Sequence, residues 1–320
     1  MKKSLKKTLA ISASLALLLA ACGKAEENGA NGSDAKLSVV TTFYPMYEFS
    51  RQVAGDLADV ALLIPAGSEP HDWEPSAQDM AKLKEADVFV YNGIVEGWVD
   101  AALTSASNDN RVVVRASEGL TTLEGAAEEE GEAGEKAHEN DHAHEHAEDP
   151  HVWLDPELAQ REVAAIEAAF EKADPANKDT YKKNADAYIA QLKALDEDFL
   201  AGLKDVKTKS FVTQHAAFGY LAQAYGLQQV PIAGLSPEQE PSPGKMAEIV
   251  EFAKSHQVKT IFFETLVDPQ VAQTVADEIG AKTDVLNPLE GLTDEEKKEG
   301  LDYIGVMKKN LEALVKALNA

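Results

Sequence analysis

Cysteine and positive charge are both scarce in this chain of 320 residues. Because Cys22 is the only cysteine, no disulfide can form within the chain. Lysine and arginine together number 30, against 55 aspartate and glutamate residues, and the formal net charge is −25 at pH 7. A surface of this sign repels nucleic acid and bare anionic lipid, and it attracts cations weakly. The composition therefore excludes a nucleic-acid-binding function.

The apolar run at the amino terminus, residues 9–21, is too short to span a membrane comfortably. It follows a lysine-rich leader and predicts the core of a signal peptide. The run ends in Leu19-Ala20-Ala21-Cys22, which resembles the lipobox of bacterial lipoproteins. The resemblance implies cleavage of a signal peptide, residues 1–21, and diacylation of Cys22, with palmitate as an expected acyl chain.

Two acyl chains hold a protein stably in a lipid bilayer, so the mature chain is expected at the extracytoplasmic face of the cell membrane. Residues 22–35 are rich in Glu, Asn, Gly and Ser and predict a flexible tether between the anchor and the folded part.

From Leu37 onward, short β-branched runs alternate with amphipathic helical stretches. This alternation predicts parallel βαβ units, and uniformly apolar strands indicate sheets covered on both faces. We expect an α/β fold of two lobes, each a parallel sheet with flanking helices. The expected strands are residues 37–42, 59–65, 87–91 and 111–115 in the first lobe, and 210–213, 229–233, 259–263 and 284–287 in the second. A single closing helix is expected over residues 293–318.

One predicted helix, residues 175–206, is long enough at about 1.5 Å per residue to connect the two lobes as a stiff strut. The alternative is an ordinary surface helix of the second lobe. We therefore predict a first lobe of residues 36–174, the linking helix, and a second lobe of residues 207–320.

Five of the eight histidines lie between residues 138 and 151. Four of them belong to an acidic stretch, residues 122–148, that has no apolar periodicity and indicates a disordered or functional insertion. Imidazoles and carboxylates are natural metal ligands, so this tract predicts weak accessory metal binding, whereas the alternative is a solvated low-complexity loop. The histidines of the tract are His138, His142, His144 and His146.

Outside the tract, three histidines lie at predicted strand ends or where the chain re-enters the fold: His71, His151 and His215. In open α/β sheets, ligands bind at the carboxyl edge of the strands. Each histidine taken alone is more often a hydrogen-bonded structural residue. Together, their equivalent positions favour one shared site.

Four motifs carry a specific resemblance: PHDWEPS at residues 70–76, DPHVWLDP at 149–156, TQHAAFGYLA at 213–222 and NPLEGLT at 287–293. They are similar to those of the cluster A-I, or ZnuA-like, solute-binding lipoproteins of bacterial ABC importers. The resemblance covers essentially the whole mature chain. It implies two α/β lobes joined by one rigid helix, with a metal ion in the cleft between them.

By this resemblance the metal ligands are His71, His151, His215 and Glu290. Glu264 is a rival for the carboxylate position, because it too follows a strand of the second lobe; alternatively it accepts a hydrogen bond from a metal-bound imidazole. Glu69, Asp72 and Glu74 lie near His71 in the sequence and could fill the same outer role.

Three imidazoles and one carboxylate suit tetrahedral Zn²⁺, whereas Mn²⁺ prefers more oxygen ligands. Manganese-binding members of the family have a carboxylate where this chain has His215. The expected cargo is therefore Zn²⁺. The resemblance further implies that the chain, expected as a monomer, delivers the ion to an ABC permease.

Three alternative functions are weighed against this one. A zinc hydrolase leaves one coordination position open for water, and this chain has no HExxH-type helix, so an enzyme is not expected. A manganese-binding importer component is the second alternative, and a surface adhesin of the same fold is the third.

Overall fold

The structure is a computed structural model that describes residues 36–125 and 148–320. The predicted signal peptide, the tether, Cys22 and the tract from His138 to His146 lie outside the described residues. Among the helices of the described ranges, none has the length and apolar character needed to cross a membrane.

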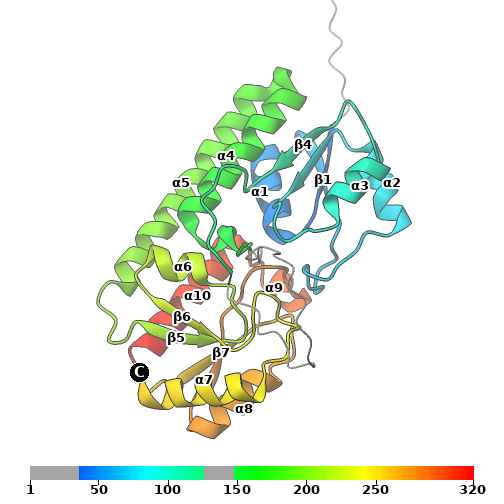
Figure 1. Cartoon of the computed structure of the whole chain (residues 1–320). Helices are drawn as coiled ribbons and strands as arrows, with labels where there is room; N and C mark the ends of the chain where they lie inside the picture. The colour runs from blue at the N-terminus through cyan, green and yellow to red at the C-terminus, as the bar shows by residue number, and fades with distance from the viewer. Residues whose placement is uncertain (1–35, 126–147) are drawn as a thin grey trace, which may run out of the picture. The chain divides into compact units, whose positions relative to one another are not determined.

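The first lobe is built on a parallel sheet with the strand order β2-β1-β3-β4 (Figure 1). Its strands are β1 (Leu37–Thr41), β2 (Ala58–Leu62), β3 (Val88–Tyr91) and β4 (Val112–Arg115). Its helices are α1 (Tyr44–Ala54), α2 (Ala77–Glu85), α3 (Val99–Ser105) and α4 (Pro156–Ala173). Helices α1 and α4 pack on one face of the sheet, and α2 and α3 pack on the other. Coverage of both faces explains why the strands are uniformly apolar.

The second lobe repeats this arrangement with the strand order β6-β5-β7-β8. Its strands are β5 (Ser210–Thr213), β6 (Gln228–Pro231), β7 (Thr260–Phe263) and β8 (Lys282–Val285). Its helices are α6 (Gly219–Ala224), α7 (Pro243–Ser255), α8 (Gln270–Ile279), α9 (Asp294–Lys298) and α10 (Tyr303–Leu318). The predicted α/β architecture with two parallel sheets is confirmed.

The single closing helix expected over residues 293–318 is wrong, because the structure divides it into α9 and α10. Gly300 adopts a left-handed conformation, with φ of 73°, which an α-helix does not accommodate. Asp302 then caps the new helix by accepting a hydrogen bond from the backbone N–H of Gly305 at 2.7 Å.

Helix α5 (Lys178–Leu203) joins the two lobes, as predicted, after a short 3₁₀ turn at Pro175–Asn177. It has 26 residues, and it packs against α1 and α4 of the first lobe and α10 of the second (Figure 1). Its buried face consists of Tyr181, Ala185, Tyr188, Leu192, Leu195, Phe199 and Leu203. The largest hydrophobic cluster therefore continues from one lobe through α5 into the other.

A buried acid on α4 gives a prediction about stability. Glu162 is fully buried, and Asn92 donates a 3.4 Å hydrogen bond to its Oε1, whereas its Oε2 has no partner within the described residues. Burial raises the pKa of Glu162 to about 8, and the nearby Glu96 adds to the shift. The folded protein therefore holds a proton on Glu162 at neutral pH.

Between the ordinary pKa of 4.5 and the folded value of about 8, the folded state binds more protons than the unfolded state. The unfolding free energy accordingly falls as pH rises through this window. The Glu162→Gln variant has no titrating group at this position, so its unfolding free energy does not fall in this way. From the lower to the upper end of the window, the variant should therefore gain on the order of 3 kcal/mol in unfolding free energy relative to the parent. Urea unfolding of the parent and the variant at the pH values that bound the window measures this change. The control is Glu157→Gln, at an exposed position on the same helix. An equal difference in unfolding free energy between variant and parent at both pH values would contradict the prediction.

Candidate metal centre

His71 lies in the loop between β2 and α2, and a neighbouring acid fixes the loop around it. The backbone N–H of His71 donates to both carboxylate oxygens of Glu69, at 2.9 and 3.0 Å. The loop ends at Ser76, whose side chain caps α2 and accepts a hydrogen bond from the backbone N–H of Asp79. The His71 side chain is 11% exposed, which makes it the most accessible imidazole of the site.

His151 enters the core directly after the undescribed segment, and Asp149 orients it. Asp149 Oδ1 accepts hydrogen bonds from the His151 backbone N–H at 3.0 Å and from Nδ1 of its ring at 2.8 Å. With Nδ1 donating to this buried carboxylate, Nε2 is left to face the site. Such a partner fixes both the tautomer and the ring orientation of a metal-binding histidine.

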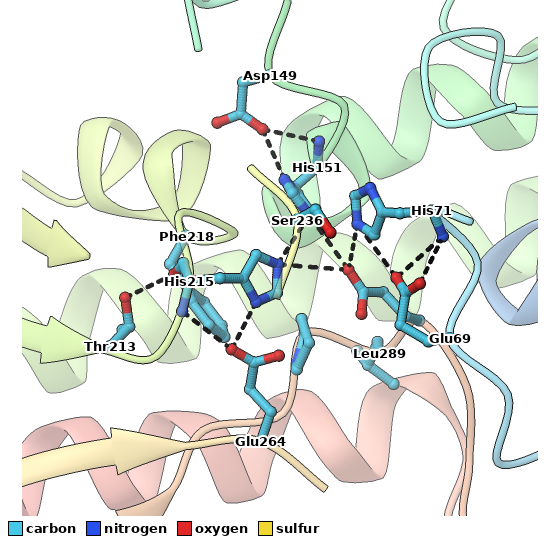
Figure 2. A network of polar contacts seen from close by, with 12 residues as sticks. Glu69, His71, Asp149, His151, Thr213, His215, Phe218, Ser236, Glu264 and Leu289 are labelled. Carbon is cyan, nitrogen blue, oxygen red and sulfur yellow. Dashed lines mark hydrogen bonds and ion pairs between the residues drawn. The ribbon is translucent and has the colours of Figure 1, made fainter. Parts of the chain in front are cut away.

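His215 follows β5, and Glu264, which follows β7, holds it in the same way. The ring Nδ1 of His215 lies 2.5 Å from Glu264 Oε1, and the backbone N–H of His215 donates to the same oxygen at 3.2 Å. Both side chains are buried. Glu264 therefore contacts the Nδ1 edge of the ring, while the Nε2 edge faces the other histidines (Figure 2).

Glu290, on the loop after β8, supplies the carboxylate on which the three imidazoles converge. Its Oε1 lies 3.0 Å from His71 Nε2, 3.2 Å from His151 Nε2 and 3.5 Å from His215 Nε2. The Nε2 atoms of His151 and His215 are 3.2 Å apart, and one donor atom from each of the four residues lies within 4.8 Å of every other. Figure 2 shows the three rings facing one another.

These separations match a tetrahedral metal site. With bonds of about 2.0–2.1 Å to Zn²⁺, neighbouring donor atoms of a tetrahedron lie about 3.3 Å apart. Four of the six separations between donor atoms, 3.0, 3.2, 3.2 and 3.5 Å, are close to that value, and the other two are within 4.8 Å. The chemistry and the spacing of the donors both fit a zinc ion.

The histidines and carboxylates of this buried cluster shift one another's pKa values. Burial raises the pKa of Glu290, but hydrogen bonds from His151, His215 and His71 outweigh it and hold that pKa well below its usual value. Burial lowers the pKa of His215, but the charges and hydrogen bonds of Glu264 and Glu290 outweigh it and raise that pKa to about 10. Glu290 is therefore held in the ionised form, which is the form in which a carboxylate binds a metal cation.

The chain matches one family over residues 39–317, namely Zinc-uptake complex component A periplasmic (ZnuA). The chain belongs to this family. The resemblance predicted from the four motifs is therefore confirmed. Members of this family are components of zinc-uptake complexes, and this role agrees with the expectation that the chain is not an enzyme.

Among relatives of this family member is the High-affinity zinc uptake system protein ZnuA of Bacillus subtilis, 54% identical over 304 residues and 94% of each chain. The Zinc-binding lipoprotein AdcA of Streptococcus pneumoniae is 48% identical over 97% of this chain, which spans 60% of the length of AdcA. The Zn(II)-bound ZnuA-like domain of AdcA has a solved structure, with a TM-score of 0.75 and 44% identity over 89% of this chain and all of that domain.

A further solved structure is that of the laminin-binding protein Lmb of Streptococcus agalactiae, described as a bifunctional protein with adhesin and metal transporting activity. It has a TM-score of 0.75 and 37% identity to this chain, and the match covers 88% of this chain and 99% of Lmb.

The structure places the candidate carboxylates differently around the histidines. Glu290 lies inside the cluster of donor atoms, and Glu264 lies behind His215. Of the three acids near His71 in the sequence, Glu69 contacts His71, whereas Asp72 and Glu74 are exposed. Asp149 was missed as a partner of His151, although its position two residues before a candidate ligand was a signal for this role.

A glycine next to Asp149 gives a second prediction. A Cβ atom on Gly219, at the start of α6, would lie 2.7 Å from Asp149 Oδ2, so Gly219→Ala must displace this carboxylate. Because Asp149 orients His151, we expect the zinc affinity to fall by about tenfold or more, as for other outer partners of metal-bound histidines. Calorimetric titration with zinc measures the effect. Gly97→Ala, where the new Cβ meets nothing within 4 Å, is the matched control, and equal affinities in the two variants contradict the prediction.

Proposed function

We propose that this chain captures Zn²⁺ with His71, His151, His215 and Glu290 and delivers it to an ABC permease for uptake. The observation that carries this proposal is the convergence of three imidazole nitrogens and one carboxylate oxygen within 4.8 Å of one another. Two ligands come from each lobe, residues 36–174 and 207–320 in the proposed division, with the linking helix, 175–206, between them.

Zinc is preferred over manganese because three of the four donors are imidazole nitrogens. Affinity for nitrogen-rich sites increases from Mn²⁺ towards the later divalent metals, and four-coordinate nitrogen sites are typical of Zn²⁺. The zinc-binding names of the relatives support the same choice. Mn²⁺ bound as tightly as Zn²⁺ in competition calorimetry would favour the manganese alternative.

Transport is favoured over catalysis because four protein ligands fill a tetrahedral coordination sphere. A catalytic zinc keeps an open position for water or substrate. In the proposed site the ligands come from both lobes, so movement of the lobes apart would release the ion. A cargo site needs this property.

Growth of a deletion strain under zinc limitation tests the delivery step. The proposal predicts that the strain stops growing when zinc is chelated and that added zinc or the parent chain restores growth. The His151→Ala chain should fail to restore it at equal expression. Rescue by this variant would contradict the proposal.

The proposal also places the chain, as a monomer, at the extracytoplasmic face of the cell membrane, anchored by acylated Cys22. Support comes from the lipobox resemblance and from the lipoprotein name of the AdcA relative. Replacement of Cys22 by serine should release the chain from the membrane fraction. We further propose that the tract from His138 to His146 gathers zinc weakly; unchanged stoichiometry and unchanged low-zinc growth after deletion of residues 126–147 would contradict this role.

Adhesion is a second candidate function, because the chain resembles Lmb over 88% of its length. Binding of the purified zinc-loaded chain to immobilised laminin tests it. A His151→Ala variant that loses zinc and still binds laminin would place adhesion on a surface separate from the metal centre.

A further inference from the structure

Trp153 lies between the two lobes, two residues after His151. It belongs to the 3₁₀ turn Val152–Leu154 of the first lobe and is fully buried. Its ring packs edge-on against Phe43, at a centroid distance of 4.9 Å, and lies 5.2 Å from the ring of His151. Its backbone carbonyl accepts a hydrogen bond from the hydroxyl of Tyr303, on α10 of the second lobe.

The indole N–H of Trp153 donates a 2.8 Å hydrogen bond to the backbone carbonyl of Pro288, two residues before Glu290. The bond therefore joins the segment that carries His151 in one lobe to the segment that carries Glu290 in the other. A buried hydrogen bond of this kind is costly to break, because no water replaces either partner.

The turn that carries Glu290 contains a strained backbone conformation, which the surrounding residues must stabilise. Leu289 is buried with φ of 61°, a left-handed conformation that is strained for a residue with a side chain. On the second-lobe side, Asn287 holds the turn by accepting a hydrogen bond from the Leu289 N–H at 2.7 Å, and Asn310 exchanges two hydrogen bonds with the backbone of Asn287. On the first-lobe side, Trp153 holds the turn through its hydrogen bond to the backbone carbonyl of Pro288.

We infer that Trp153 is a positioning residue for zinc capture: its indole N–H fixes the turn of Asn287–Glu290 so that Glu290 meets the histidines of the opposite lobe. The inference rests on the proposed zinc-capture function. Trp153 does not touch the ion, so its effect on affinity passes through Glu290. This separates it from a residue that merely fills space in the core.

The first test compares two tryptophan-to-phenylalanine substitutions. Trp153→Phe removes the hydrogen bond and keeps an aromatic ring, and we expect a zinc dissociation constant about tenfold higher. Trp98→Phe is the matched control, because Trp98 is also buried and its indole N–H has no partner within the described residues. Equal zinc affinities in the two variants overturn the inference.

The second test shows whether the effect passes through Glu290. In a Glu290→Gln background the carboxylate is already lost, so adding Trp153→Phe should change the zinc dissociation constant little. A purely structural role of Trp153 predicts the same fold-change in both backgrounds, which overturns the inference. If the parent chain binds no zinc, the proposed function fails; if the parent binds zinc and Trp153→Phe binds it equally well, only this inference fails.

A third variant changes only the indole N–H, so a loss of zinc affinity in it cannot be attributed to misfolding. Incorporation of 3-benzothienylalanine at position 153 keeps the size and shape of the indole ring and replaces the N–H with sulfur. The same tenfold loss of zinc affinity is expected, with an unchanged circular dichroism spectrum. Parent-like affinity in this variant overturns the inference.

Discussion

The His215→Ala variant is expected to lose more than about 100-fold in zinc affinity, which exceeds the 10- to 100-fold effect of removing an outer partner of a metal-bound histidine. Two reasons combine. The substitution removes one of four ligands, and it leaves the buried Glu264 without the imidazole that lies 2.5 Å from it. Leaving a buried carboxylate unpaired is costly, so the variant should also be less stable than the parent.

His256→Ala is the control for this experiment. His256 is exposed at the end of α7, where its ring stacks on Phe252 at 3.9 Å, and it is not part of the metal cluster. Calorimetric titration with zinc should give parent-like affinity for His256→Ala. Retention of tight zinc binding by a folded His215→Ala chain would remove His215 from the ligand set.

Zinc should also raise the melting temperature strongly, because its ligands come from both lobes and bind the ion in the folded state. At a free zinc concentration of about 1,000 times the dissociation constant, binding adds about 4 kcal/mol to the unfolding free energy. For a folded region of this size, that corresponds to an increase on the order of 10 °C in melting temperature. Addition of EDTA should reverse the shift.

The thermal measurement is sharpest on a chain that lacks residues 126–147, since the accessory histidines are then absent. The same deletion combined with His151→Ala provides the control, in which zinc should give little stabilisation. Equal zinc-induced shifts in the two chains would mean that the stabilising ion binds elsewhere.

The sequence was sufficient to predict the fold and three histidines of the cluster, because both follow from local patterns. Apolar runs alternating with helices predict parallel sheets, and His71 and His215 each follow a strand. His151 was found by its return into an apolar segment. These features depend on residues that are close together in the chain.

The carboxylate could not be chosen from local patterns. Glu264 follows β7 and Glu290 follows the neighbouring β8, so both lie at the same edge of the sheet. The choice depends on the turn before Glu290, where Leu289 adopts φ of 61° and Asn310, 23 residues further along the chain, contacts Asn287. A strained turn held by a distant helix leaves little trace in the local sequence.

The division of the closing helix was missed for a different reason. The amphipathic pattern continues across residues 293–318, and Gly300 alone did not distinguish an interior helical glycine from a helix end. The structure shows that Gly300 has a positive φ and that Asp302 restarts the helix. Asp149 was missed because carboxylates crowd the whole preceding segment.

X-ray absorption spectroscopy at the zinc edge is the most direct test of the central claim that these four residues hold one zinc ion. The sample is the zinc-loaded chain without residues 126–147, so that the accessory histidines do not contribute. We predict one zinc per chain, coordinated by three imidazole nitrogens and one carboxylate oxygen at about 2.0–2.1 Å. Fewer than three imidazoles, or a six-coordinate oxygen shell, would contradict the claim.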